Sequence, residues 1–583
     1  MVICVTKGLS NLFPIYTKHL KLPRFIHSSR ASLFTTGNMM NAKPPNVLIY
    51  SNVESIQQEL VSFLRTVLAV NEYTVYPVTK HQVKARTWPE STNLFLVHGA
   101  VESDLAEEFL DFFLHGGKLM SVCSNLQSFV LSCKEWKADN LPQNALQRDA
   151  ATSGKKFVTT LRDTQGATRE AQFDELFWEK TNNSPSVVSL TDLKTGGKAV
   201  FSEIAFADSP NSSNLTSNTK SNLDFFRDLL KSQFGIKINL AIPPNVPAYA
   251  NGYFLGNSRR KLHFLSQTVN PVKSGDLSLM FCKDLTDCLE PSSTMQPVLV
   301  HETPEDFDTV EYYNHLKSSH IGQLVIYLPV ATSAMTIISH AELCHGFVII
   351  PRQQTSGVGR SKNQWLSPKG CAMFSLQMHV PLNSPFGQRL PLIQHLVAVA
   401  VVRGIRGIAN CDKLDIRLKW PNDIYANRVV KIGGLIINSR FDSDQAVVNI
   451  GCGLNVNNSS PTGCIDDLIR EFNAKNNTNY PCLRIEQTLA LIFNEIERLY
   501  DAIQCGEVDM QHLYDLYYEN WLHQDIPVTM KDAKGSEMSG IVTGIDEYGY
   551  LLVKTDNIAQ PFTVHPDGNS FDMMKGLIIP KYF

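Results

Sequence analysis

Short apolar runs alternate with amphipathic segments from residue 46 onward, and this alternation limits the fold more than any other feature of the sequence. A strand, a helix and a further strand in succession are typical of a parallel sheet with helices on its faces. The expected strands are 47–50, 94–97 and 118–123, and the expected helices are 55–68 and 105–114. We therefore predict an N-terminal α/β domain over residues 46–305, with a surface loop at 208–222.

The second half of the chain repeats the α/β pattern and then changes character. Strand-like runs fall at 323–328, 346–350, 372–380, 415–420, 431–438 and 446–450. Helical spacing of apolar residues is present at 392–405, 487–503 and 510–521. After residue 521, short strand-like runs separated by turns indicate a small β-barrel. We divide this half into an α/β domain over 306–520 and a barrel over 521–583.

Length, charge and cysteine content exclude several classes of protein. A chain of 583 residues is too long for one core and predicts two to four domains. The formal net charge of −3 argues against a broad basic face for nucleic acid. No apolar run approaches the roughly 18 residues of a membrane span. The 12 cysteines are scattered without a Cys-x-x-Cys pair, so we expect reduced thiols and no protein-bound metal. From the charge and the apolar runs, we predict no DNA partner and no membrane partner.

The first 45 residues are expected to be a targeting or disordered segment. No acidic residue precedes Glu54, while basic and hydroxyl residues are frequent, as in a mitochondrial transit peptide. A tail without targeting function is the alternative. Met39 and Met40 lie just before the globular part, and a start at either residue would give a cytosolic form. We therefore expect cytoplasmic and mitochondrial forms.

The loop after the expected strand at 346–350 combines glycines with positive charge. Gly357 and Gly359 let the backbone approach a ligand and can turn N–H groups toward an anion. Arg360 and Lys362 supply the charge that a triphosphate or an acyl phosphate needs. An ordinary turn between strands is the alternative. The loop is not a P-loop, because the Gly-Lys-Ser/Thr spacing is missing.

Three strand ends carry further candidates. Pro421 ends one strand, which leaves Asn422 and Asp423 where ligand groups can converge. Lys431 follows after eight residues and is backed by a pair of glycines, which suits an ammonium aimed at a phosphate. The last strand ends in Gly-Cys-Gly-Leu-Asn, where Asn455 offers an amide to a base or ribose.

The order and spacing of these segments resemble the catalytic domain of biotin–protein ligases, and most closely the eukaryotic holocarboxylase synthetases. The shared segments are 357–368, 419–425, 431–434, 451–455 and 565–572. The likeness is strong from about residue 310 and loose before it. It implies a class II aminoacyl-tRNA-synthetase-like α/β domain followed by an SH3-like β-barrel, preceded by a flavodoxin- or amidotransferase-like α/β domain.

The resemblance also implies a reaction in two steps. Biotin and MgATP give biotinyl-5′-AMP and pyrophosphate, and a lysine amine of a carboxylase then attacks the mixed anhydride. The implied cofactors are therefore ATP and Mg²⁺, with biotin as the substrate. The implied partners are the carboxyl-carrier domains of acetyl-CoA, propionyl-CoA, methylcrotonyl-CoA and pyruvate carboxylases.

Residue roles follow from the matching positions. Ser333 and Gln354 should contact the ring system of biotin, and the loop of Arg360 should fold over the adenylate. Lys431 should hold the carboxylate and α-phosphate oxygens, and Asn455 should reach the adenine. Asn422 and Asp423 should orient phosphate, metal or the incoming amine. The residues expected to do chemistry are Lys419, Asn422, Asp423, Arg360 and Lys431, and those expected to bind substrate are Ser333, Gln354, Gly357, Gly359, Trp365, Gly433, Gly434, Gly453 and Asn455.

Two departures from the family pattern stand near these residues. Ser333 is followed by Ala334 where the family has a Ser-Thr pair, so one hydrogen bond to biotin is expected to be lost or replaced. Ser361 stands where a glycine often follows the loop arginine, which should stiffen the loop. Neither change removes a charge, so we expect the activity to be kept.

Other interpretations of the sequence remain open. A lipoate or octanoate ligase shares the implied fold, and a weakly catalytic regulatory scaffold is a further alternative. His340 and His345 are five residues apart, which does not place them on one helical face as zinc ligands. Cys123 resembles the nucleophile of class I glutamine amidotransferases, but no partner histidine is recognisable, so we predict a regulatory N-terminal domain without that activity.

Overall fold

The computed structural model describes residues 44–580, except 70, 85, 87, 127–155, 163–167, 180–183, 205–216, 240–246, 361–362, 532–536, 556–559, 567–568 and 573–576. The expected targeting segment up to residue 43 lies outside the described residues, and so do Ser361 and Lys362.

The N-terminal part is a mixed sheet, parallel in one half and antiparallel in the other. Its described strands are β1 (Asn46–Ser51), β2 (Thr74–Pro77), β3 (Thr92–His98), β4 (Lys118–Val122), β5 (Lys156–Arg162), β6 (Thr168–Glu179), β7 (Ser184–Asp192) and β8 (Lys198–Ser202). They lie in the order β2-β1-β3-β4-β8-β7-β6-β5. Strands β2, β1, β3, β4 and β8 are parallel, as predicted, whereas β5 to β7 form an antiparallel extension that the sequence pattern did not reveal.

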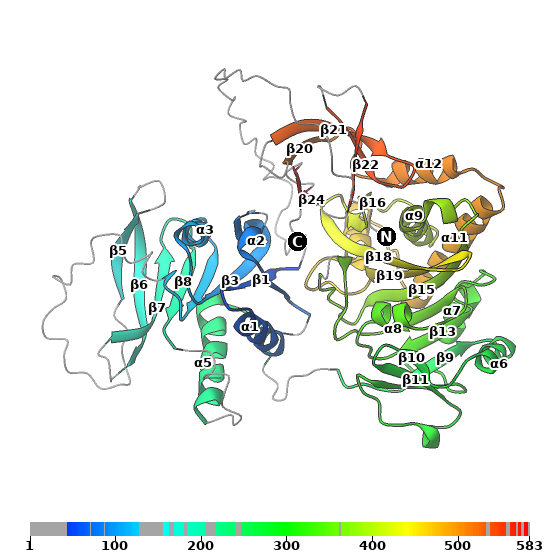
Figure 1. Cartoon of the computed structure of the whole chain (residues 1–583), viewed down its shortest axis with the longest axis horizontal. Coiled ribbons are helices and arrows are strands. Elements are labelled where there is room, and N and C mark those ends of the chain that lie inside the picture. Colours follow the sequence, from blue (N-terminus) through cyan, green and yellow to red (C-terminus); the bar gives the residue numbers. More distant parts are fainter. Residues whose placement is uncertain are drawn as a thin grey trace, which may run out of the picture. The chain divides into compact units, whose positions relative to one another are not determined.

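Helices cover both faces of this sheet, because each has one apolar side (Figure 1). The helices are α1 (Glu54–Val67), α2 (Lys80–Lys84), α3 (Ser103–Leu114) and α5 (Ser217–Phe234). Helix α1 buries Leu60 and Leu64 in one core, and α3 buries Phe109 and Phe113 in another. The loop expected at 208–222 is wrong at its end, because α5 begins at Ser217.

A second sheet contains the strands that were expected to form the catalytic domain. Its described strands are β9 (Gly252–Gly256), β10 (Val272–Ser274), β11 (Leu277–Cys282), β12 (Met295–Leu299), β13 (Leu324–Leu328), β14 (Phe347–Pro351), β15 (Cys371–Pro381), β16 (Ile416–Lys419), β17 (Asp423–Ala426), β18 (Val430–Asp442) and β19 (Gln445–Asn455). They lie in the order β10-β11-β12-β9-β13-β14-β15-β19-β18-β17-β16.

The predicted domain boundary at residue 305 does not separate two sheets. Strands β9 to β12 precede it in sequence, yet β9 pairs antiparallel with β13, and Tyr253 lies opposite Tyr327. The change of sheet in the described chain therefore falls between β8 and β9, about fifty residues before the predicted boundary.

Helices cover this sheet and build its largest core. They are α6 (Ser258–Gln267), α7 (Thr309–His315), α8 (Ala334–His340), α9 (Leu392–Arg406), α10 (Ile465–Asn476), α11 (Ile485–Gln504) and α12 (Met510–Asn520). Nearly every residue of α9 is buried, because α9 lies between the sheet and α11 (Figure 1). A Cβ at Gly404 would lie 2.9 Å from the Cα of Ile492, so glycine lets these two helices approach closely.

The C-terminal part is a small sheet of short strands, as expected for the barrel. The described strands are β20 (Pro527–Lys531), β21 (Glu537–Ile545), β22 (Leu551–Lys554), β23 (Phe562–Val564), β24 (Asn569–Asp572) and β25 (Leu577–Pro580), in the order β23-β22-β21-β20-β25-β24. Val528, Val542 and Leu551 from these strands belong to the same apolar core as α9 and α11. The barrel is therefore packed directly on the helices of the second sheet, β9 to β19, which we call the catalytic sheet.

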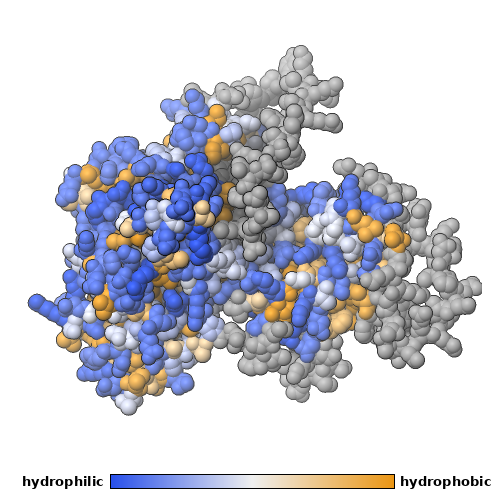
Figure 2. Space-filling view, turned by 180° about the vertical axis from the view of Figure 1, so that it is seen from behind, coloured by the Kyte–Doolittle hydropathy of each residue, from blue (hydrophilic) through white to orange (hydrophobic). Residues whose placement is uncertain are grey.

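Polar residues dominate the face shown in the space-filling view, and apolar residues lie among them in small groups (Figure 2). In the ranges that the structure describes, no helix combines the length and the apolar character needed to cross a membrane.

Candidate active site

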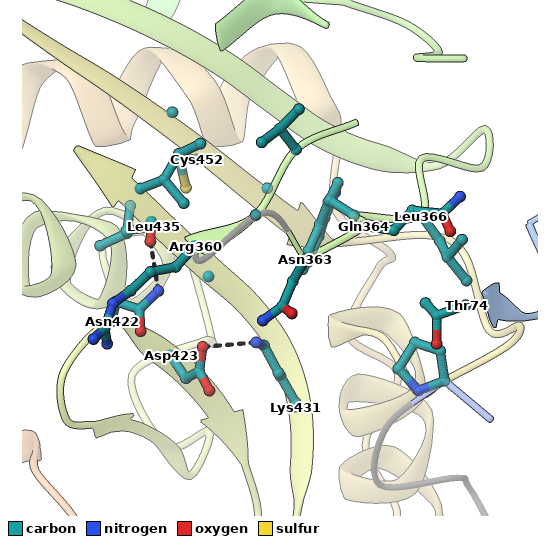
Figure 3. A pocket seen from close by; sticks show the side chains of 18 of the residues that line it. Thr74, Arg360, Asn363, Gln364, Leu366, Asn422, Asp423, Lys431, Leu435 and Cys452 are labelled. Carbon is teal, nitrogen blue, oxygen red and sulfur yellow. Dashed lines mark hydrogen bonds and ion pairs between the residues drawn. The ribbon is translucent and has the colours of Figure 1, made fainter. Parts of the chain in front are cut away.

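A pocket opens where the loop after β14, the strand ends at 419–423 and the glycine-rich parts of β18 and β19 meet (Figure 3). Most of the residues predicted from sequence line it: Gln354, Gly359, Arg360, Trp365, Lys419, Asn422, Asp423, Lys431, Gly434, Gly453 and Asn455. Ser333, Gly357 and Gly433 are not among its lining residues.

A cation and a carboxylate form one corner of the pocket. The Nζ of Lys431 lies 2.6 Å from Oδ1 of Asp423, and the two side chains are 25% and 16% exposed. The residues come from neighbouring strands, β18 and β17, whose register shifts by a bulge beside Tyr425. A Cβ at Gly434 would lie 3.5 Å from Oδ1 of Asp423 and 3.6 Å from Nζ of Lys431. Glycine therefore keeps the space next to this ion pair open.

Asn422 is fixed beside the same corner. Its Nδ2 donates to the backbone carbonyl of Leu435 at 2.6 Å, and the backbone carbonyl of Asn422 accepts from the N–H of Leu435 at 2.9 Å. One N–H of the side-chain amide is used in this way, so the side-chain oxygen and the second N–H are the groups that can face a ligand. Lys419, at the end of β16, is only 8% exposed, and its Nζ lies 5.5 Å from the ring centre of Tyr425. A second ammonium is thus held close to the pocket.

The loop of Arg360 is folded back on itself. The N–H of Trp365 donates to the carbonyl of Gly357 at 2.8 Å, and the N–H of Gly359 donates to Asn363 at 2.6 Å. The expectation that the Gly359 N–H faces an anion is therefore wrong for this conformation, because the loop uses it internally. Gly357 has a packing role, since a Cβ there would lie 2.4 Å from the carbonyl oxygen of Trp365. Arg360 donates from Nη2 to the carbonyl of Pro566 in the C-terminal barrel.

Two of the predicted glycines make room for neighbouring groups. A Cβ at Gly453 would lie 2.4 Å from Cε2 of Trp365, so the indole packs against β19 only because residue 453 has no side chain. At Gly433 a Cβ would lie 3.0 Å from the carbonyl oxygen of Gly453. The structure thus assigns Gly433 to the close pairing of β18 and β19 and not to the pocket wall.

Asn455 holds a loop. Its side-chain amide spends its hydrogen bonds on groups of the protein, so it has no donor or acceptor left for the predicted direct contact with adenine. Its Nδ2 donates to Oγ1 of Thr462 at 2.8 Å and more weakly to the carbonyl of Gly463. Its Oδ1 accepts from Nδ2 of Asn458 at 3.0 Å and from the thiol of Cys371. Asn458 and Thr462 line the pocket together with Asn455, so Asn455 fixes the shape of this wall.

Ser333 and Gln354 meet at the start of α8. Ser333 is 2% exposed and caps the helix, because its Oγ accepts from the N–H of Thr336 at 3.4 Å. The expected direct contact between Ser333 and the acid does not agree with this buried position. Gln354 does line the pocket; its Oε1 accepts from the N–H of Ala334 at 2.8 Å, and its Nε2 donates to Ser367 at 3.1 Å.

Part of the pocket lining is apolar, and the sequence interpretation missed it. The apolar lining residues include Met335, Met373, Leu435, Ile436 and Cys452. Burial raises the pKa of the Cys452 thiol to about 12, so this residue stays a neutral thiol near pH 7. The signal was present in β15 and β19, where alternate residues face the same side of the sheet, but apolar residues in buried strands are common in any core.

Two motifs outside the pocket have structural partners. His340 ends α8 with Nδ1 bound to the carbonyl of Thr336, whereas His345 accepts the N–H of His379 at 3.0 Å. Cys123 lies exposed at the end of β4, and its thiol donates to the carbonyl of Glu203 at 3.4 Å. Burial and the Glu203 carboxylate raise the pKa of Cys123, which disfavours the thiolate.

Comparisons with known proteins agree with the geometry. Residues 327–455 match the biotin/lipoate A/B protein ligase family, and residues 523–576 match the biotin protein ligase C terminal domain. A biotin–protein ligase of Homo sapiens is 29% identical over 591 residues, which cover 93% of this chain and 78% of that protein. Biotin–protein ligase 2 of Arabidopsis thaliana is 34% identical over 294 residues, which cover 48% of this chain and 85% of that protein.

A solved biotin protein ligase from Aquifex aeolicus, in complex with biotin and ATP, aligns with 41% of this chain and 95% of its own, at a TM-score of 0.33 and 19% identity. The matched segments and the two-part architecture define a ligase of the biotin and lipoate class. Within that class, the relatives are more specific. The chain belongs to the biotin–protein ligase family and is an enzyme of the eukaryotic type.

Proposed function

We propose that the enzyme joins biotin to ATP in this pocket and then passes the biotinyl group of biotinyl-5′-AMP to a lysine of a carboxyl-carrier domain. The observation that carries the proposal is that apolar residues and the corner made by Lys431 and Asp423 line the same pocket. Apolar lining residues suit an aliphatic carboxylic acid, and an ammonium in the same pocket suits the charge of a carboxylate and of phosphates.

In the first step, an oxygen of the biotin carboxylate attacks the α-phosphorus of ATP. The bond from that phosphorus to the bridging oxygen breaks, and pyrophosphate leaves with the electron pair. Negative charge spreads over the phosphate oxygens during this exchange, so a donor already in place stabilises the transition state more than the ground state. We assign this role to Lys431, and Lys419 adds a second fixed positive charge nearby.

Magnesium is expected to arrive with the nucleotide. Mg²⁺ prefers oxygen ligands and usually keeps substrate phosphates and water in its shell. No group of three or more His, Cys, Asp or Glu side chains in the described ranges is arranged to hold a metal by itself. The carboxylate of Asp423 and the side-chain oxygen of Asn422 fit an ion held mainly by phosphates, which would neutralise charge on the leaving pyrophosphate.

In the second step, a neutral lysine amine attacks the carbonyl carbon of the mixed anhydride, an amide bond forms, and AMP leaves. The amine loses a proton in this step, and we assign Asp423 to orient the amine or to accept that proton. The loop of Arg360 is assigned to enclosing the adenylate between the two steps, since the anhydride reacts with water when exposed.

The acid and the acceptor can be tested together. Purified enzyme is given ATP and a carboxyl-carrier domain with labelled biotin, lipoate or octanoate in parallel. Transfer of biotin in clear preference to the other two supports the proposal. Preference for lipoate or octanoate would make the enzyme an acyl ligase of the second kind, and transfer of none of the three would favour a regulatory scaffold.

The acceptors and the location are proposed from the resemblance. The carrier domains of acetyl-CoA, propionyl-CoA, methylcrotonyl-CoA and pyruvate carboxylases are the proposed substrates, in cytosol and mitochondria. The acid-free composition of residues 1–45 supports import of chains that begin at Met1, while chains that begin at Met39 or Met40 stay in the cytosol. Tagged forms with each start, compared by microscopy, test this; identical cytosolic distributions would contradict it.

A further inference from the structure

The C-terminal barrel is connected to the pocket through Trp420, which lies between Lys419 and the strand end with Asn422 and Asp423. The backbone N–H of Trp420 donates to Nε2 of His523 at 2.9 Å. Its indole Nε1 donates to the carbonyl of Gly549 at 2.9 Å. Both acceptors belong to the C-terminal part: His523 lies just before β20, and Gly549 lies in the turn between β21 and β22. Trp420 is 3% exposed, so neither N–H has water as an alternative partner.

The Gly549 turn is itself held in place from the catalytic side. The carbonyl of Gly549 accepts a second hydrogen bond, at 3.1 Å, from Nε2 of His395 on α9. A carbonyl can only accept, so Nε2 of His395 carries the proton. Gly549 has φ +80°, and a Cβ there would lie 2.3 Å from Nε2 of His395. Glycine is therefore required for this turn to approach α9.

His523 needs the opposite protonation of Nε2 from His395. It accepts a backbone N–H through Nε2, so this nitrogen must be unprotonated. Burial, together with the nearby Lys419 ammonium, lowers the pKa of His523 to about 3, which keeps the acceptor available. The preceding residue, Leu522, donates its N–H to the carbonyl of Leu418 at 2.9 Å, so the segment continues the edge of β16.

We propose that His523 and the Gly549 turn are positioning residues for adenylate formation: they fix Trp420, and through it the strand end that presents Asn422 and Asp423 to Lys431. The inference rests on the proposed function. Neither residue lines the pocket, so neither is expected to bind biotin or ATP. A group displaced by about 1 Å from its productive position can cost on the order of 10² in rate. The barrel thus contributes to the chemistry of the first step without touching the substrates.

The test compares His523→Leu with His523→Gln in biotin-dependent ATP–pyrophosphate exchange. Leucine leaves the Trp420 N–H without an acceptor, whereas the glutamine oxygen can replace Nε2. We expect kcat of His523→Leu to fall by about 10- to 100-fold with KM for biotin within about threefold. His523→Gln should stay within about threefold of wild type in both constants.

Two further variants separate positioning from stability. Tyr518→Phe removes a hydroxyl that accepts the N–H of Ile545 at 3.0 Å, a contact of the same junction that does not involve Trp420. It should lower the melting temperature but leave kcat unchanged. Trp420→Phe removes the donor to Gly549 together with one ring of a side chain that lines the pocket, and it should lower kcat. This variant decides the matter if His523→Leu does not fold.

The outcomes are distinguishable from a failure of the proposed function. If wild-type enzyme shows no biotin-dependent exchange, the proposed function fails. If wild type exchanges but Trp420→Phe and every folded His523 variant keep the wild-type kcat, or if His523→Gln falls as far as His523→Leu, the positioning role is wrong. A loss of kcat in Tyr518→Phe equal to that in His523→Leu would likewise show that general destabilisation is the cause.

Discussion

The N-terminal sheet and the catalytic sheet each gather polar side chains at one edge, but only the catalytic edge has its ion pair beside the candidate reactive groups. At the carboxyl ends of β1, β3 and β4, Ser51 lies 3.2 Å from Nδ1 of His98, and Cys123 follows β4. Burial lowers the pKa of His98 and raises that of Cys123, so both favour their neutral forms. At the pocket, Lys431 and Asp423 form an ion pair beside a glycine. The difference indicates that the catalytic edge is suited to chemistry because it has a paired lysine and carboxylate, with a glycine next to them.

The largest expected effect comes from removing the charge at the catalytic edge. Lys431→Ala should slow biotin-dependent ATP–pyrophosphate exchange by about 10²–10³, because one preorganised donor in such a site is worth ~3–4 kcal/mol. The matched control is Lys118→Ala in the N-terminal sheet, whose Nζ donates to the carbonyl of Phe234 at 2.7 Å. The control should keep the exchange rate. Equal losses in the two variants, or normal exchange by Lys431→Ala, would remove the contrast between the edges.

Arg360→Gly should uncouple the two steps and not block the first. The loop encloses the product, so adenylate still forms but escapes, and free biotinyl-AMP should rise by about tenfold or more at equal exchange rate. The measurement is released biotinyl-AMP together with biotin on bystander lysines. Retention of the adenylate as tight as in wild type would show that the loop has another role.

Gly453→Ala should act through Trp365. The added Cβ would lie 2.4 Å from Cε2 of the indole and would displace it from β19. We expect KM for ATP to rise by about tenfold, or ~1.4 kcal/mol. In Gly434→Ala the added Cβ would lie 3.5 Å from its nearest neighbour, Oδ1 of Asp423, which is an ordinary contact, so the effect should be smaller. The reverse order of the two variants would contradict the packing account of the pocket wall.

Acidification should lower the folding stability of the catalytic sheet and the packed barrel, because two of their histidines are buried. Burial holds the pKa of His395 at about 4 and, with Lys419, that of His523 at about 3, against 6.5 for an exposed side chain. Between these values the unfolded chain binds more protons, so stability falls as pH drops below about 6.5. At pH 5 the loss should be about 2 kcal/mol per histidine. Hydrogen exchange of α9 measured at pH 7 and pH 5 tests this; His395→Gln should remove its share, and an unchanged pH response in that variant would contradict the assignment.

The smallest expected effect is at the N-terminal edge. Cys123→Ser should leave biotin transfer unchanged, and neither form should hydrolyse glutamine. Detection of glutaminase activity in wild type that is lost in the variant would show that this edge is also catalytic.

Much of the fold could be predicted because the strands of the catalytic sheet are buried apolar runs. The expected strand at 372–380 corresponds to β15 (Cys371–Pro381), and the helix at 392–405 corresponds to α9. Strands β9 to β12 could not be recognised, since they carry no distinct period and join the sheet only through β9, which pairs with β13 across a long stretch of sequence. Local pattern indicates that a strand exists, but not which sheet it joins.

The site was predictable to the extent that its residues are unusual for a core. Charged residues beside glycines at strand ends, such as Lys431 and Asp423, identified the corner. Asn455 and Ser333 were assigned to the ligand, yet Asn455 binds the side chain of Thr462 and Ser333 caps α8, because amides and hydroxyls bind protein groups and ligands equally well. The link from Trp420 to His523 depends on two segments about a hundred residues apart, which no spacing rule could reveal.

The most direct test of the central claim is a single-turnover reaction without an acceptor protein. Enzyme, biotin and ATP are mixed, and pyrophosphate and enzyme-bound biotinyl-AMP are measured before a carboxyl-carrier domain is added. We predict a burst of about one pyrophosphate per active site and an equal amount of bound adenylate. On mixing with the carrier domain, the biotinyl group of this adenylate should pass to a carrier lysine. Pyrophosphate release that requires the carrier from the start, or a burst that Lys431→Ala preserves in full, would contradict it.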